Sequence, residues 1–140
     1  GDLEREIISN LQTFLLELGK GFAFIGRQYK VTLGGRHFFV DLVFYHRILK
    51  CFVLIDLKRG EIDHGDIGQM NLYLNYFSEE ENTEGDNPPI GIVLGAYKDE
   101  VLVKYATSGL TNQLFVSKYQ LYLPDETSLR QEVQRIIEQE

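Results

Sequence analysis

The chain of 140 residues has one cysteine, one methionine, three prolines and no tryptophan. Its cysteine, Cys51, cannot form a disulfide within the chain and has no Cys or His partner at zinc-ligand spacing, so neither a disulfide scaffold nor a zinc site is predicted. No apolar run approaches the roughly 18 residues of a membrane span, and the opening GDLEREIISN lacks the pattern of a signal peptide. These absences favour a soluble, cytoplasmic domain that does not bind a membrane, with Cys51 packed as a small hydrophobe.

The charge of the chain is unevenly distributed. The formal net charge is −7, yet the segment from Lys20 to Arg59 carries +6 and the remainder −13. Five acids and no base stand in SEEENTEGDN, residues 78–87, which is typical of a solvated loop. Because a phosphate backbone meets the local field, the net acidity does not exclude a nucleic-acid partner.

Apolar residues recur at intervals of three and four from Leu3 to Leu18, which predicts an amphipathic helix that ends at Gly19. Glu4 breaks this pattern, because at 100° per residue it falls inside the apolar arc. Two interpretations are open: Glu4 favours the helix dipole and reaches water, or it faces a site in the core.

The remaining pattern predicts a single α/β domain. Strand-like runs at 28–33, 37–45 and 50–58 are separated by a Gly34-Gly35 hairpin turn and a short turn at 46–49. A helix follows Gly65 and carries Gln69 and Tyr73 on one face, and further strands are predicted at 90–96, 100–106 and 114–123 before a last helix at 128–138. The order αβββαββ(β)α predicts a mixed sheet flanked by helices.

Charged residues stand in two of these strands where apolar ones are expected. Asp41 lies between Val40 and Leu42, and the run CFVLIDLKRG ends with Asp56 and Lys58, whose i and i+2 spacing places them on one strand face. If the register allows, Asp41 and Asp56 share a site on adjacent antiparallel strands. Two such carboxylates repel unless a proton or a cation lies between them, and a hard cation such as Mg²⁺ satisfies this demand.

Lys58 has two interpretations. Its ammonium can stabilise developing negative charge on a phosphodiester or orient an attacking water. It is a poor free general base, because nearby carboxylates favour its charged form. The alternative is a simple Asp56–Lys58 ion pair, which is the commoner explanation of an isolated D-x-K. The combination of this D-x-K tripeptide with Asp41 and Glu4 favours a metal site over a simple ion pair.

The acid followed by D-x-K on the next strand, after a helix with a Glu, resembles the PD-(D/E)XK nuclease superfamily. The blocks FLLELGKGFAFIGRQY, FFVDLVFYHR, VLIDLKRG, GQMNLYLN and DNPPIGIVL resemble the C-terminal domain of its YhcG-type members, from about Leu3 to Leu123. The resemblance implies a restriction-endonuclease-like fold and a Mg²⁺-dependent nuclease, with Mn²⁺ able to substitute. Val40 replaces the proline of the superfamily name, which removes no ligand.

The resemblance also implies roles for individual residues. Asp41 and Asp56 would be metal ligands, completed by the backbone carbonyl of Leu57. Lys58 would be the catalytic lysine, Glu4 the acid of the first helix, and Gln69 the glutamine of the helix after the core motif.

Family members carry a separate N-terminal, DNA-binding domain, so residues 1–140 would be a nuclease domain excised from a longer protein. DNA is then the expected substrate, and the bases expected to make local phosphate contacts are Arg27, Lys30, Arg47 and Arg59. Arg36 and Lys50 are interpreted as solubilising turn residues, and His46 as a turn residue near Asp41. Analogy with related nucleases implies a homodimer.

Two hypotheses follow. The first is a metal-dependent DNA endonuclease, in which metal-activated water attacks in line. The second is a nucleic-acid-binding or assembly domain on a nuclease scaffold, with little or no cleavage in isolation.

Overall fold

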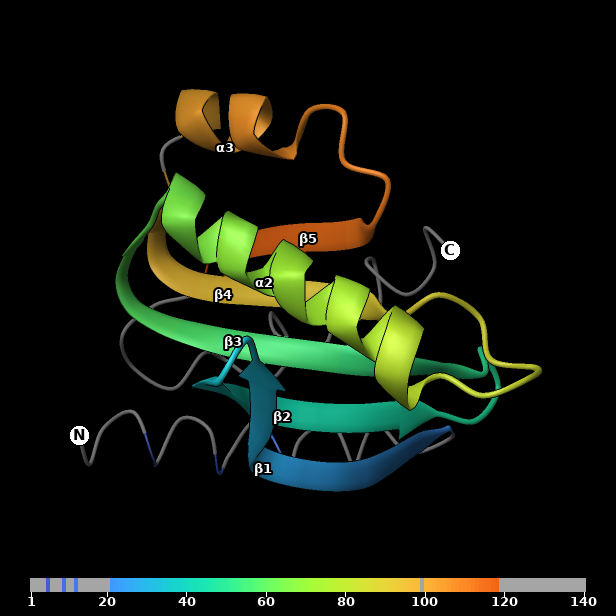
Figure 1. Cartoon of the computed structure of the whole chain (residues 1–140). Coiled ribbons are helices and arrows are strands. Elements are labelled where there is room, and N and C mark those ends of the chain that lie inside the picture. Colours follow the sequence, from blue (N-terminus) through green and yellow to red (C-terminus); the bar gives the residue numbers. More distant parts are fainter. Residues whose placement is uncertain (1–4, 6–8, 10–11, 13–20, 99, 119–140) are drawn as a thin grey trace.

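The computed structural model describes residues 5, 9, 12, 21–98 and 100–118. These residues contain a five-stranded sheet in the order β1-β2-β3-β4-β5, with helix α2 across one face (Figure 1). The elements are β1 (Phe22–Leu33), β2 (Arg36–His46), β3 (Cys51–Ile62), α2 (His64–Tyr76), the π-helical turn η1 (Phe77–Glu81), β4 (Ile90–Lys98), α3 (Glu100–Thr107) and β5 (Gln113–Lys118). No helix in these ranges is long and apolar enough to cross a membrane.

The sheet is mixed, as the sequence predicted. Strands β1, β2 and β3 form an antiparallel meander, whereas β4 pairs with β3 and β5 pairs with β4 in parallel. The predicted hairpin turn between β1 and β2 is confirmed, since Gly34 and Gly35 have φ angles of 56° and 78°. Glycine adopts this left-handed conformation without steric cost, which permits a two-residue turn.

One predicted strand is wrong. Residues 100–106 belong to helix α3 and not to the sheet. Parallel β4 and β5 need a crossover connection, for which a helix is the usual solution, and Val103 and Ala106 of α3 pack against the core beside α2. The order of elements from β1 to β5 is therefore βββαβαβ, with η1 following α2 directly, and the predicted αβββαββ(β)α is corrected at this position.

Other boundaries differ by a few residues. Strand β1 starts at Phe22 instead of 28, and β3 extends to Ile62. The acidic segment predicted as a loop begins inside η1, which continues α2 to Glu81. The strand predicted at 114–123 is β5 as far as Lys118. Positions 5, 9 and 12 of the predicted helix at 3–18 are helical. The other residues of that helix, Glu4 among them, and the predicted helix at 128–138 lie outside the described residues.

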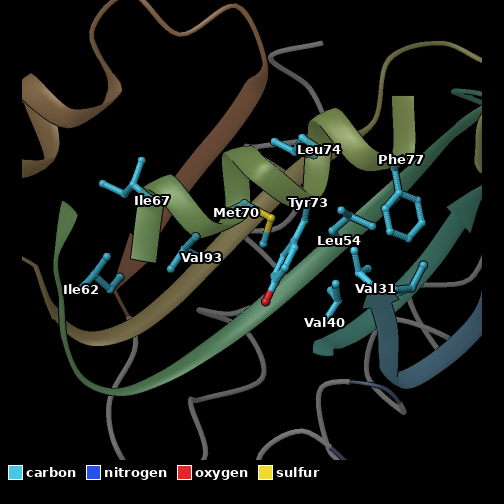
Figure 2. Close-up of a cluster of buried hydrophobic side chains, with 11 residues drawn as sticks. Val31, Val40, Leu54, Ile62, Ile67, Met70, Tyr73, Leu74, Phe77 and Val93 are labelled. Carbon is cyan, nitrogen blue, oxygen red and sulfur yellow. The ribbon is translucent and has the colours of Figure 1, made fainter. Parts of the chain in front are cut away.

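The two faces of β3 enter two separate apolar clusters. Val53, Ile55 and Leu57 pack with Leu42 and Phe44 on one face. Leu54, between them, packs on the other face with residues of α2, among them Met70, Tyr73 and Leu74 (Figure 2). Asp56 and Lys58 continue the alternation from Leu54, so they lie on the face of the sheet that α2 covers.

Candidate active site

A cavity of about 370 Å³ lies between the sheet and the first half of α2. Its lining includes four of the predicted catalytic residues and the predicted carbonyl contributor. The lining residues are His37, Phe38, Phe39, Asp41, Asp56, Leu57, Lys58, Asp66, Gln69, Tyr73 and Val93. The fold thus brings together residues from β2, β3 and α2, as the sequence predicted.

The cavity opens where β2 and β3 separate. Their pairing runs from His46 opposite Cys51 to Leu42 opposite Ile55, which leaves Asp41 and Asp56 as the next opposed residues. Beyond this point β2 continues along β1, and β3 continues along β4. The two carboxylates therefore stand at a fork in the sheet.

Each aspartate binds the backbone of the opposite strand. The Asp41 N–H donates to Asp56 Oδ1 at 2.9 Å, and the Leu57 N–H donates to Asp41 Oδ2 at 2.7 Å. The carboxylates take the place of the main-chain acceptors that the diverging strands no longer supply. The predicted proximity of Asp41 and Asp56 therefore has a specific structural cause.

The carboxylate pair has an excess of negative charge. Burial, and then the charge of Asp41, raise the pKa of Asp56 to about 7, although the hydrogen bond from the Asp41 N–H acts in the opposite direction. A carboxyl group in such a place is neutralised by a proton or by a cation near neutral pH. The donor chemistry therefore fits a positively charged ligand between these residues.

Helix α2 presents three polar residues to the cavity at i, i+3 and i+7, namely Asp66, Gln69 and Tyr73. Gln69 is exposed, whereas the Tyr73 side chain is 1% exposed and packs in the core. Burial and the charges of Asp56 and Asp41 raise the pKa of Tyr73, which keeps its hydroxyl protonated near the carboxylates. From the sequence, a packing role was favoured for Tyr73. The structure confirms that Tyr73 is buried and also places it close to Asp56 and Asp41.

Lys58 forms an ion pair with Asp66, with 3.2 Å between Nζ and Oδ1. Asp66 also belongs to the capping box of α2: its Oδ2 accepts from the Asp63 N–H, and its own N–H donates to Asp63 Oδ1. The sequence analysis missed Asp66. The D-x-x-D spacing at residues 63–66 is typical of a helix start, but the contact with Lys58 depends on how β3 turns into α2.

Gln28 is a second residue that the sequence analysis missed. Its Nε2 donates to Asp41 Oδ1 at 2.9 Å, from the strand on the far side of β2 from Asp56. Its φ angle is 47°, which is uncommon for a residue other than glycine.

Arg27, Lys30 and Arg47 are not among the described residues that line the cavity. Arg27 and Lys30 are exposed on β1, and Arg59 lies in β3 directly after Lys58. Arg47 is exposed in the turn after β2, about 20 Å along the strand from Asp41 at some 3.3 Å per residue. A contact of Arg47 with DNA would therefore be remote from the carboxylate pair.

His46 is the buried last residue of β2. Its Nδ1 accepts from the Leu49 N–H at 3.0 Å, its ring packs edge-on against Phe22, and burial lowers its pKa. The predicted turn role is corrected, because His46 ends β2 and pairs with Cys51, although its ring accepts from the turn that follows. His46 is not among the described residues that line the cavity.

The donor set favours a hard cation. Within residues 21–98 and 100–118, and at positions 5, 9 and 12, no group of three or more His, Cys, Asp or Glu side chains could hold a metal ion. The pair formed by Asp41 and Asp56 is nevertheless sufficient for Mg²⁺, which is held by one or two carboxylates and keeps several waters. Such a pair does not fit a zinc site.

Comparison with known proteins agrees with this geometry. Residues 1–134 match the family model of the YhcG PDDEXK nuclease domain. The chain is 46% identical over 134 residues to the protein named "Putative nuclease YhcG" of Escherichia coli (strain K12), which covers 96% of this chain and 36% of that one. The chain thus spans about a third of the length of this relative.

One solved structure, that of a repair endonuclease, shows the same fold. A repair endonuclease from Pyrococcus abyssi superposes with a TM-score of 0.54 at 22% identity, over 80% of this chain and 46% of that one. The structure of an EndoMS–dsDNA complex has a TM-score of 0.49 at 17% identity, over 81% and 45% of the two chains. The fold of the chain is therefore that of restriction-endonuclease-like repair endonucleases.

Proposed function

Since the chain belongs to the family of YhcG PDDEXK nuclease domains, we propose that it is a Mg²⁺-dependent endonuclease that hydrolyses phosphodiester bonds of DNA. The observation that carries the proposal is the carboxylate pair of Asp41 and Asp56 at the fork of the sheet, with Lys58 beside it on the same cavity. Mn²⁺ would substitute for Mg²⁺, because it accepts the same oxygen ligands.

The chain would hold the metal with Asp41, Asp56 and the backbone carbonyl of Leu57. When bound, the metal would supply an activated water and neutralise charge on the phosphate. Water would attack the phosphorus in line with the leaving oxygen.

Lys58 and α2 would act on the substrate around this centre. The Lys58 ammonium, held by Asp66, would donate to a phosphate oxygen as negative charge develops. The amide of Gln69, exposed on the same cavity, would orient the water or the phosphate.

The second candidate is a binding or assembly domain with little cleavage of its own. It is favoured by the net charge of −7 and by the one-third coverage of the YhcG relative, which leaves room for a DNA-binding domain elsewhere. Calorimetric titration with Mn²⁺ separates the candidates. A nuclease is expected to lose metal affinity in Asp41→Asn protein, whereas a binding platform need have none.

The direct test is a cleavage panel over linear, nicked, forked and four-way DNA, with this chain and the full-length protein assayed in parallel. We expect products with Mg²⁺ or Mn²⁺ and none with EDTA, because the bound metal is the proposed source of activated water at the site. Equal cleavage in EDTA, or by Asp41→Asn protein, would contradict the proposal.

A second prediction concerns Asp66. The Asp66→Ala protein is expected to cleave DNA roughly tenfold more slowly, because Lys58 loses the carboxylate that orients it. The expected loss of stability is about 1 kcal/mol, from the broken capping box.

The matched control is Asp63→Ala. It removes the other half of the same capping box and leaves Lys58 and Asp66 in place. Its stability should fall by a similar amount, measured by urea unfolding, while its cleavage rate stays close to that of the unsubstituted protein. Equal slowing in both variants would show that Asp66 acts through helix stability alone.

A further inference from the structure

Gln28 has a backbone conformation that its residue type disfavours. Together with Lys50, which has a φ angle of 54°, it is one of two residues other than glycine with positive φ among those described. Glycine, asparagine and aspartate enter this region most easily, whereas a longer side chain makes it strained. Such strain persists where the surrounding structure requires it, which is often at functional sites.

The strained residue stands directly opposite Asp41. Strands β1 and β2 pair Arg27 with Leu42 and Tyr29 with Val40, so Gln28 and Asp41 are the facing residues that the pairing leaves out. The end of β1 turns up toward α2 after its first half (Figure 1). The left-handed residue thus lies in the middle of β1, and His37, Phe38 and Phe39 of the same hairpin line the cavity.

The side chain of Gln28 donates a hydrogen bond to the Asp41 carboxylate. Its amide donates to Oδ1 at 2.9 Å, while the Leu57 N–H donates to Oδ2 at 2.7 Å from the other neighbouring strand. Two donors on opposite sides fix the plane of the carboxylate. Each carboxylate oxygen can accept more than one interaction, so hydrogen bonding to Gln28 and Leu57 is compatible with cation binding by Asp41.

We propose that Gln28 is a positioning residue that holds the Asp41 carboxylate in the orientation in which it binds a divalent cation together with Asp56. The inference rests on the proposed function, since the cation is the one required there. It differs from a purely structural role, because the bend alone would be served better by glycine.

The test compares Gln28→Gly with Lys50→Gly. Both replace a strained residue by glycine, so both are expected to raise the melting temperature slightly or leave it unchanged. Lys50 lies in the turn after β2, away from the cavity lining. In a calorimetric titration, Gln28→Gly protein is expected to bind Mn²⁺ roughly tenfold more weakly, as the loss of a hydrogen bond to a charged group implies, whereas Lys50→Gly protein keeps its affinity.

A second variant, Gln28→Asn, keeps an amide and tolerates the same backbone conformation, but its side chain is shorter by one methylene. It is expected to weaken Mn²⁺ binding as well, because the amide no longer reaches Asp41 Oδ1.

Unchanged Mn²⁺ affinity in folded Gln28→Gly and Gln28→Asn proteins would overturn the inference and leave the proposed function intact. Loss of the native fold in both variants would also overturn it, since the role would then be structural. Absence of Mn²⁺ binding by the unsubstituted chain would overturn the proposed function and this inference with it.

Discussion

Replacing Asp56 by asparagine is expected to make the metal-free protein more stable at pH 8, by on the order of 3 kcal/mol, and to reduce DNA cleavage by roughly a thousandfold. Burial and the charge of Asp41 raise the pKa of Asp56 from 3.8 to about 7. At pH 8 the folded protein therefore carries an unfavourable charge that asparagine lacks. The asparagine oxygen can still accept a hydrogen bond from the Asp41 N–H, so the contact between β2 and β3 at this position is expected to be kept.

The pH dependence of this gain has a definite sign. Because the folded pKa of Asp56 is above its unfolded value, the folded state binds more protons between about pH 4 and pH 7, and the free energy of unfolding falls as pH rises through this window. The advantage of Asp56→Asn is therefore absent below pH 4 and complete above pH 8. Added Mg²⁺ should stabilise the unsubstituted protein at pH 8 and leave the Asp56→Asn protein unchanged.

The measurement is urea unfolding in EDTA from pH 4 to pH 8, combined with the cleavage assay. Asp86→Asn is a control of opposite sign, because hydrogen bonds from the Thr83 N–H and the Tyr45 hydroxyl lower the pKa of Asp86. That variant should lose stability at neutral pH, regain the difference as pH falls through the acid range, and cleave DNA normally. A stability gain for Asp56→Asn that does not depend on pH would contradict the electrostatic explanation.

Replacing Lys58 by methionine is expected to reduce cleavage by roughly a hundredfold to a thousandfold. Methionine has similar length without the ammonium that would stabilise charge on the phosphate. The Lys58 side chain is 47% exposed, so the loss of its ion pair with Asp66 should change stability by less than about 1 kcal/mol. Mn²⁺ affinity should change little, because Lys58 is not among the proposed ligands.

Single-turnover cleavage with saturating Mg²⁺ measures this effect, with Mn²⁺ titration and urea unfolding on the same samples. The matched control is Lys104→Met, which removes an exposed lysine on α3 outside the cavity lining and should leave cleavage unchanged. Normal cleavage by Lys58→Met protein would show that Lys58 serves only to fasten α2 to the sheet through Asp66.

The sequence alone predicted much of the sheet and the pairing of the two aspartates. Apolar runs bounded by turn signals located β2 and β3, and a charge flanked by apolar residues was recognisable in each strand without any structure. The Gly34-Gly35 turn set the hairpin of β1 and β2. The short turn after β2 favoured a shared site for Asp41 and Asp56, but the register that makes them opposed residues is known only from the structure.

The remaining features depend on tertiary structure. The run EVLVKYA is a short apolar segment whose periodicity fits a strand or a buried helix, and only the parallel pairing of β4 and β5 decides for the helix. The contact of Asp66 with Lys58 depends on the turn between β3 and α2. The role of Gln28 depends on a left-handed residue inside a strand, which a strand pattern does not indicate.

The exchange of hydrogen bonds at the fork affects how natural variation in this family can be interpreted. Asp41 accepts the Leu57 N–H where the β2–β3 ladder ends, so selection for a folded sheet would retain Asp41 even in a relative that had lost its activity. Lys58 and Gln69 are exposed, and the pairing of the strands does not depend on their side chains. In an inactive relative these two positions would therefore be substituted first. Among relatives, loss of Lys58 should therefore mark an inactive descendant more reliably than a retained Asp41 marks an active one.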